Sequence, residues 1–274
     1  MAIKKYIPLA LKQRARALQT QARLVNARHY CPVCDSRVIA FLPLPDFFRE
    51  NQQKYGFPFA DSDAETCNTT AYLCPSCEAS DRDRLYAIYL GDYVKSLNNA
   101  ELVDFGPSEP LSVFIRRLIK GRNIHYRTAD LLTDNADDRV DITDLRSYED
   151  DRFDSFICSH VLEHVPDDRK ALRELYRILK PGGKAILMVP IILSIDQVDE
   201  DASVTDEAER WRRFGQGDHI RLYSKSGFLE RVRAAGFRVH ELGSEFFGAE
   251  LFDRAGISRQ SVLYVVEKAT DSHG

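Results

Sequence analysis

The chain contains no run of about 18 apolar residues, which a membrane-spanning helix would need. Its first residues also lack an apolar core followed by a small-residue cleavage site, as a secretion signal would have. A net charge of −4 gives no general attraction to nucleic acid. No internal repeat or low-complexity segment occurs. These absences predict a soluble, cytoplasmic protein of ordinary globular composition.

Acidic residues are missing from the first 30 positions, which carry seven Lys or Arg. Small and apolar side chains recur there at helical spacing: Leu11, Ala15, Leu18, Ala22 and Val25. The pattern predicts a basic N-terminal helix over residues 1–29, and we favour its packing on the protein itself. The alternatives are weak contact of residues 1–28 with an anionic membrane surface, or contact with RNA.

Cysteine is too sparse, at six residues, for a disulfide framework in a chain of 274. Four of the six form two matched pairs, Cys31-Pro-Val-Cys34 and Cys74-Pro-Ser-Cys77. Two such pairs can supply four thiolates to one tetrahedral ion, and a closed site of this kind acts in folding. We therefore predict a structural Zn²⁺ in a zinc-ribbon-like region, residues 30–80. Free or redox-active thiols are the alternative.

Residues 153–191 are the most informative segment. An apolar strand runs into the polar pair Ser159-His160, and an amphipathic helix, a Pro-Gly-Gly turn and a second apolar strand follow. Ligands bind at the carboxyl ends of strands in such β-α-β units. The loop of residues 159–164 is therefore a candidate wall of a site.

Two motifs in this segment, HVLEHVPD at His160–Asp167 and LKPGG at Leu179–Gly183, together resemble the class I S-adenosylmethionine-dependent methyltransferases. The resemblance covers residues 81–274. It implies an α/β fold with a doubly wound, Rossmann-like sheet of seven strands, the last two forming an antiparallel hairpin. It also implies methyl transfer from S-adenosylmethionine to an oxygen or nitrogen nucleophile. We expect a small-molecule or saccharide-type acceptor.

The cofactor residues follow from the first two strands of that domain. Asp104 and Gly106 match the acidic residue and first glycine of the family's loop, whereas Pro107 and Ser108 replace its later glycines. The resemblance implies that this loop holds the methionine end of the cofactor. Asp130, at the tip of the second strand, can accept hydrogen bonds from both ribose hydroxyls. Capping of the next turn is the other interpretation.

The same resemblance places Asp141 at the adenine amino group and Ile142 beside the ring. Ser159 and His160 would line both the cofactor and the acceptor, and His164 could point the same way. Both histidines are candidate catalytic bases, and a structural role is the alternative for each.

A long excursion, residues 194–218, interrupts the pattern and precedes the segment DHIRLYS. Long loops on this side of a sheet usually shape the acceptor pocket. We predict that Asp218, His219 and Arg221 face an anionic or sugar-like acceptor, with His219 as a third candidate base. A solvated surface loop is the alternative.

Two other functions remain open from the sequence. The cysteine region and the basic helix could dock RNA, which would make the chain a zinc-ribbon RNA methyltransferase. The Pro107-Ser108 departure is the one feature that favours a non-catalytic binding protein that has kept the fold.

Overall fold

The computed structural model describes residues 27–270. The predicted basic helix therefore lies outside the described residues, apart from positions 27–29. None of the helices that the structure describes has the length and apolar character needed to cross a bilayer.

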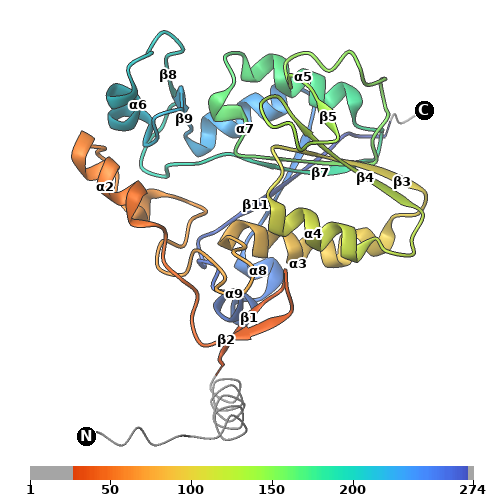
Figure 1. Cartoon of the computed structure of the whole chain (residues 1–274). Helices are drawn as coiled ribbons and strands as arrows, with labels where there is room; N and C mark the ends of the chain where they lie inside the picture. Colours follow the sequence, from red (N-terminus) through yellow and green to blue (C-terminus); the bar gives the residue numbers. More distant parts are fainter. Residues whose placement is uncertain (1–26, 271–274) are drawn as a thin grey trace, which may run out of the picture.

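A seven-stranded sheet forms the centre of the molecule, in the order β10-β11-β7-β6-β3-β4-β5 (Figure 1). The strands are β3 (Ala100–Phe105), β4 (Ile124–Asp130), β5 (Asp138–Arg139), β6 (Ser155–Ser159), β7 (Lys184–Met188), β10 (Arg238–Leu242) and β11 (Leu263–Glu267). The first five are parallel to one another. β11 is antiparallel to both β7 and β10, which confirms the predicted closing hairpin.

Helices cover both faces of the sheet, as expected for strands that are apolar on both sides. In Figure 1, α3 (Asp81–Ser96) and α4 (Glu109–Leu118) lie beneath it, and α5 (Asp168–Ile178) and α7 (Lys225–Ala234) lie above it. Short helices α8 (Ser244–Phe247) and α9 (Ala249–Ala255) precede β11. The predicted doubly wound α/β fold is confirmed.

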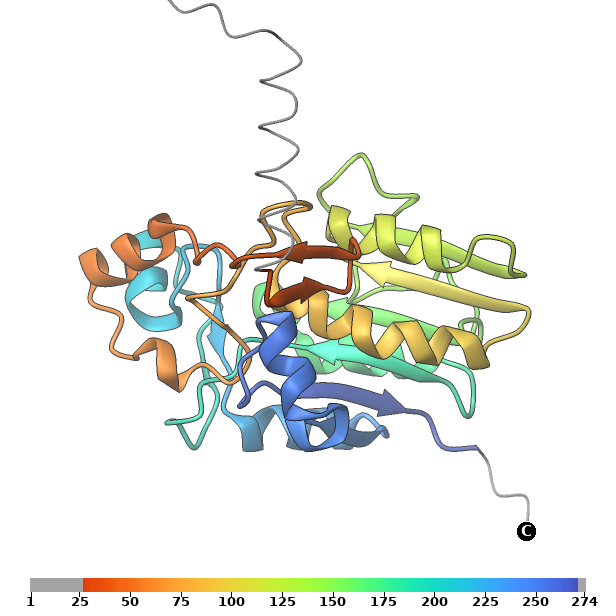
Figure 2. The same cartoon turned by 90° about the horizontal axis from the view of Figure 1, so that it is seen from below.

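The cysteine region packs into the same hydrophobic core as the sheet. A small hairpin, β1 (His29–Cys31) and β2 (Ser36–Val38), carries the first cysteine pair. Its buried side chains, including Val33 and Val38, join the core cluster that contains the sheet residues. In Figure 2 this hairpin lies beside α3 and α9.

Arg84 of α3 holds these parts together. Its side chain is fully buried, with the guanidinium 3.8 Å from the centre of the Phe41 ring. It donates hydrogen bonds to five backbone carbonyls, those of Ala71, Tyr72, Ala79, Ala255 and Gly256. One buried cation therefore links the cysteine region, α3 and the end of α9, with its donors satisfied by carbonyls.

A second, smaller core lies beyond the carboxyl ends of the strands. Here α2 (Asp46–Tyr55) and the 3₁₀ turn η1 (Asp61–Asp63), both from between the cysteine pairs, meet the excursion after β7. That excursion contains β8 (Asp199–Glu200), α6 (Glu207–Phe214) and β9 (Arg221–Leu222). Phe57 and Phe59 pack on a cluster of Ile192, Phe214 and Leu222. Figures 1 and 2 show α2 against α6.

Candidate active site

A cleft of about 780 Å³ runs along the carboxyl ends of β3, β4 and β6. Residues at these strand ends, and in the loops that follow them, line the cleft. Four of the predicted cofactor residues are among them: Gly106, Asp130, Asp141 and Ile142. A parallel sheet binds its ligands at this edge, so the cleft is the candidate cofactor site.

Gly106 lets the chain turn sharply at the end of β3. Its φ of +64° lies in the left-handed region, which favours glycine. A Cβ atom at this position would also lie 2.9 Å from Cγ2 of Val161, in the loop after β6. Both the backbone conformation and the close approach therefore require glycine here.

Asp130 ends β4, and its contacts show the turn cap that was the second interpretation of this residue. Its Oδ1 accepts hydrogen bonds from the backbone N–H groups of Leu132 and Thr133, at 2.7 and 2.9 Å, so it caps the following turn. The carboxylate also lines the cleft. Leu131 and Leu132 lie beside it, 48% and 84% exposed, and extend the apolar wall formed with Ile142.

The other predicted cofactor residues are absent from the described lining of this cleft. Asp104 is buried and accepts a hydrogen bond of 2.7 Å from the Tyr126 hydroxyl. Ser108 caps α4 and donates to Asp83, at the start of α3, over 2.7 Å. These contacts fix the loop after β3, which carries Pro107, from behind.

Ser159 also lies behind the site. Its hydroxyl is 2.8 Å from that of Tyr86, which tightens the packing of α3 against the end of β6.

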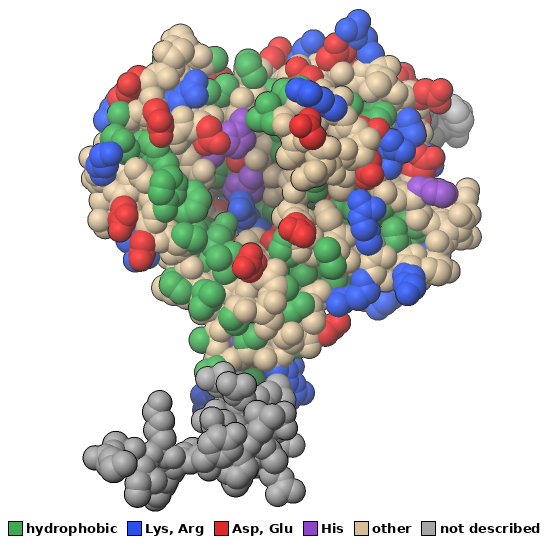
Figure 3. Space-filling view, viewed as in Figure 1, with side chains coloured by type: hydrophobic (Ala, Val, Ile, Leu, Met, Phe, Trp, Pro, Cys, Tyr) green, Lys and Arg blue, Asp and Glu red, His purple; other side chains and the backbone are tan. Residues whose placement is uncertain are grey.

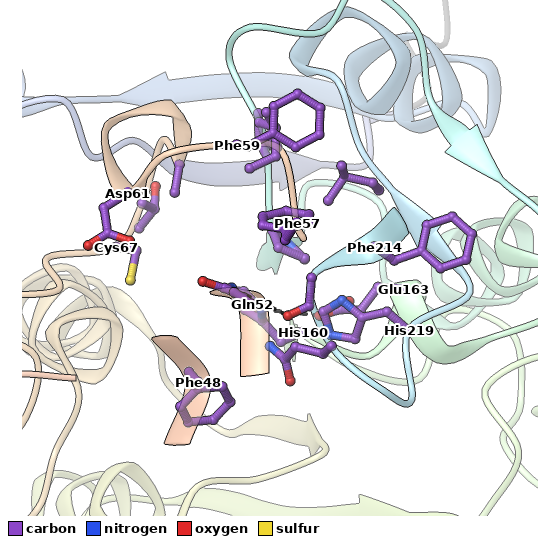
Figure 4. Close-up of a pocket in the computed structure, with 18 of the residues that line it drawn as sticks. Phe48, Gln52, Phe57, Phe59, Asp61, Cys67, His160, Glu163, Phe214 and His219 are labelled. Atoms are coloured by element: carbon purple, nitrogen blue, oxygen red, sulfur yellow. Dashed lines mark hydrogen bonds and ion pairs between the residues drawn. The ribbon is translucent and has the colours of Figure 1, made fainter. Parts of the chain in front are cut away.

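A second cavity, of about 280 Å³, adjoins the cleft, and His160 and His164 line both. Its walls come from the segment between the cysteine pairs and from the excursion after β7. Most are apolar or aromatic, including Phe48, Phe57, Phe59 and Phe214. Figure 3 shows histidine side chains inside a hollow near the middle of this face. The close-up in Figure 4 shows the aromatic rings around it.

His160, Glu163 and His219 gather at one end of this second cavity (Figure 4). The backbone of His160 is left-handed, with φ at +56°, and its N–H donates to Met188 of β7 over 2.9 Å. Histidine is among the few residues that tolerate this conformation. Its Nδ1 lies 3.1 Å from Oε1 of the fully buried Glu163.

Burial and neighbouring charges shift the pKa values of His160, Glu163 and His219. Burial lowers the pKa of His160 to about 4, and it lowers the pKa of His219 as well. Burial opposes ionisation of Glu163, but the charges of His160, His219 and His164 outweigh it and bring the pKa of that carboxyl to about 2. Glu163 is therefore the ionised member of this group at neutral pH.

The three substrate-facing predictions, Asp218, His219 and Arg221, fall in three different places. His219 is buried in the wall of the second cavity, and Asp218 lines the cofactor cleft. Arg221 is buried away from both cavities. It donates to the carbonyls of Leu162 and Val165, each over 2.6 Å, and so clamps the 3₁₀ turn η2 (Leu162–His164).

Several residues that line the second cavity were not predicted as site residues from the sequence. Glu163 is central to the group, and its one signal was its place between two histidines in the HVLEH motif. Arg82 lines the second cavity and donates to the Tyr72 hydroxyl over 3.1 Å. Phe48, Phe57 and Phe59, between the two cysteine pairs, also line this cavity.

The four paired cysteines come together as predicted, with their sulfurs all within 4.8 Å of one another. Cys31 and Cys77 are 3.8 Å apart at Sγ, and Cys34 and Cys74 are 3.9 Å apart. A tetrahedral ion with Zn–S bonds of about 2.3 Å sets its sulfurs roughly 3.8 Å apart. The donor set therefore fits zinc.

The sequence matches the family described as methyltransferase domain over residues 63–242, about two thirds of the chain. A ubiquinone/menaquinone biosynthesis C-methyltransferase, UbiE, of Vibrio campbellii is 30% identical over 129 residues, 42% of this chain and 44% of that protein. A ubiquinone biosynthesis O-methyltransferase of Xanthomonas oryzae is 36% identical over 70 residues, 26% of this chain and 28% of its own length. The chain thus aligns with less than half the length of these curated relatives.

Solved structures with a similar arrangement include the [4+2]-cyclase SpnF, with a TM-score of 0.41 and 20% identity, covering 84% of this chain and 98% of that one. Another is an arsenic(III) S-adenosylmethionine methyltransferase from Chlamydomonas reinhardtii, with a TM-score of 0.36 and 19% identity, covering 62% of each chain.

Proposed function

The chain belongs to the methyltransferase domain family, and we propose that it transfers a methyl group from S-adenosylmethionine to an oxygen or nitrogen of a small-molecule or saccharide-type acceptor. One observation carries the proposal: a cleft at the strand ends and an aromatic cavity share His160 and His164 as lining residues. A donor and an acceptor bound on the two sides would meet at this wall.

The cleft offers suitable groups for each part of the cofactor. Asp130 can accept hydrogen bonds from the ribose hydroxyls through the oxygen that does not cap the turn. Ile142 and the exposed Leu132 give apolar surface for the adenine, and Asp141 lies at its edge. Gly106 leaves room for the backbone to approach the methionine end.

The second cavity suits a single ring. Its volume of about 280 Å³ is near the lower end for ligand pockets, roughly 300–1,000 Å³. Phenylalanine faces suit an aromatic ring or the apolar face of a sugar, while Arg82 and Asp61 provide polar contacts. A hydroxylated aromatic ring is one acceptor of this class, and the Xanthomonas relative is named an O-methyltransferase.

His160 is the proposed general base. The cofactor supplies the methyl group as an electrophilic carbon on a sulfonium. The Nδ1 atom of His160 faces Glu163, which leaves Nε2, buried and without a partner among the described residues, to take the acceptor's proton. With both bound, the acceptor's lone pair would form the new bond to the methyl carbon as the carbon–sulfur bond breaks and its electrons return to sulfur. Positioning and exclusion of water would supply much of the rate.

Cofactor binding is tested by calorimetric titration of the full chain with S-adenosylmethionine. Asp130→Asn removes a charged acceptor, worth about 1.5–3 kcal/mol, so binding should weaken roughly 10- to 100-fold. Asp134→Asn is the matched control, because Asp134 is 93% exposed nearby and does not line the cleft. Equal affinity of all three proteins would remove Asp130 from the site. No binding by the wild type would refute the proposed function.

The acceptor is tested with a labelled methyl donor and a panel of hydroxylated aromatic compounds and monosaccharides. His160→Gln should abolish transfer of label while leaving the affinity for the methyl donor within a few-fold. Transfer at the wild-type rate would show that His160 is not the base.

We also propose that a structural Zn²⁺ binds Cys31, Cys34, Cys74 and Cys77 within the region of residues 30–80, ahead of a methyltransferase domain of residues 81–274. The sulfur spacing supports this. Cys74→Ser should lower the zinc content by one equivalent and destabilise the chain. Cys67→Ser is the control, since Cys67 stands apart from the four.

A further inference from the structure

A second cluster of side chains that could hold a metal ion lies in the wall of the second cavity, the proposed acceptor cavity. Glu163, His164 and His219 each offer one ligand atom, and these atoms lie within 4.8 Å of one another. Glu163 and His164 lie on η2, and His219 lies in the loop before β9. The three residues are far from the four cysteines in sequence and share no side chain with them.

Glu163 is the unusual member of the cluster. Its side chain is fully buried, yet neither carboxylate oxygen has a hydrogen-bond partner among residues 27–270. An isolated carboxylate in such a place costs several kcal/mol unless a cation or donors compensate it. Nδ1 of His160 approaches one oxygen at 3.1 Å without hydrogen-bond geometry, so this contact accounts for one oxygen at most.

Both histidines can present a lone pair to an ion. Nδ1 of His164 lies 3.2 Å from the carbonyl oxygen of Asp218, which can only accept, so the proton sits on Nδ1 and Nε2 is free. Nδ1 of His219 is buried and has no partner within the described part of the chain. The two rings meet edge to face, with centres 4.8 Å apart.

The two segments that carry these residues are tied together. The Ile220 N–H donates to the Glu163 carbonyl over 3.0 Å, which joins the loop before β9 to η2. Arg221 holds the carbonyls of Leu162 and Val165 on either side of Glu163 and His164. The cluster is therefore held by backbone contacts, as a preorganised site requires.

We propose that Glu163, His164 and His219 bind one divalent transition-metal ion at the floor of the acceptor cavity. Two imidazoles and one carboxylate form a donor set that suits zinc, iron, cobalt or manganese, and three protein ligands leave positions open. The role of the ion rests on the proposed function. An acceptor hydroxyl bound at an open position would lose its proton more readily, and His160 lies beside the cluster to take it.

The test measures how many equivalents of zinc each protein binds. The full chain is dialysed to saturation against buffered Zn²⁺, freed of loose ions, and analysed by elemental mass spectrometry. Glu163→Gln and His219→Gln should each hold one equivalent less than the wild type. The difference does not depend on how far the cysteine site is filled. His240→Gln is the matched control, because His240 lies on the remote strand β10 and pairs with Glu267.

A loss of one equivalent in the Glu163 and His219 variants, with the control unchanged, supports the site. Equal zinc content in all four proteins overturns it. Should the buried substitutions unfold the chain, His164→Gln, at a partly exposed position, removes a ligand with less effect on the core. Unchanged zinc content in a folded His164→Gln protein overturns the site equally.

Calorimetry with S-adenosylmethionine on the same preparations separates this inference from the proposed function. Cofactor binding without the extra metal equivalent would refute the metal site alone. An extra equivalent that depends on Glu163, without cofactor binding, would refute the proposed function alone.

Discussion

Replacing Asp104 by asparagine should stabilise the protein, and increasingly so as the pH rises. Asp104 is 2% exposed in the middle of the sheet. Burial raises the pKa of its carboxyl from 3.8 to about 7; the Tyr126 hydrogen bond opposes this rise, and the charge of Asp83 adds to it. Asparagine keeps an oxygen that can accept from Tyr126 but does not ionise.

The direction of this pH dependence follows from the protons that the folded and unfolded chains bind at Asp104. Between pH 3.8 and about 7 the folded chain holds a proton on Asp104 that the unfolded chain has released. Stability from this carboxyl is thus complete below pH 3.8 and falls as the pH rises to 7. Each pH unit between the unfolded and folded pKa values corresponds to about 1.36 kcal/mol, so the loss amounts to roughly 4 kcal/mol above pH 7.

Urea unfolding of both proteins at intervals from pH 4 to 8 measures this effect. Other titrating groups, including the cysteine cluster, are common to both proteins. Their contributions therefore cancel in the difference between the two free energies of unfolding. The asparagine variant should gain on the wild type by about 1.4 kcal/mol for each pH unit, and the gain should level off near pH 7. A constant difference across this range would refute the reasoning. Tyr126→Phe, which removes the hydrogen bond, should extend the window to higher pH.

Two further predictions concern the joint between the cysteine region and α9. Gly256→Ala should lower the free energy of unfolding by more than about 2 kcal/mol, because φ is +64° and a Cβ would overlap the ring of Phe41. Gly121→Ala, with φ at +78° and open space around it, should cost only about 1 kcal/mol; equal effects in thermal unfolding would contradict the packing argument. Arg84→Met should cost at least about 3 kcal/mol in chemical denaturation, because buried carbonyls lose their donor; a smaller loss would show that water replaces it.

Much of the fold could be predicted from the sequence, because most strands appear as short apolar stretches bounded by turn residues. β6 ends at Ser159, where the sequence placed the end of an apolar strand, and β10 and β11 pair antiparallel as the resemblance implied. β5 could not be predicted, since Asp138 and Arg139 are charged and form a strand only by pairing with β4. A carboxylate–guanidinium contact between Asp138 and Arg127 accompanies that pairing.

The second cavity, which we propose as the acceptor site, was harder to predict from the sequence, because segments far apart in the chain form it. Nothing near Phe57 signals that it meets Phe214, more than 150 positions away.

Arg221 was predicted to face the acceptor, and the structure does not place it there. A charged residue that follows a long loop suggests exposure, but Arg221 is buried, with its guanidinium donating to the carbonyls of Leu162 and Val165 and to the carboxylate of Glu200. The Asp104, Ser108 and Ser159 side chains follow strand ends as expected, and only their contacts show that they support the cleft from behind.

The segment from Cys34 to Cys74 begins at the first cysteine pair and ends at the second, and the sulfurs of these two residues lie 3.9 Å apart. It walls one side of the acceptor cavity and contributes nothing to the described lining of the cofactor cleft. We therefore expect that this segment could be replaced without changing the lining of the cofactor cleft. Evolution, or an engineer, could lengthen, shorten or graft the stretch between fixed anchor points and redirect the enzyme to another acceptor, while the machinery for the methyl donor stays intact.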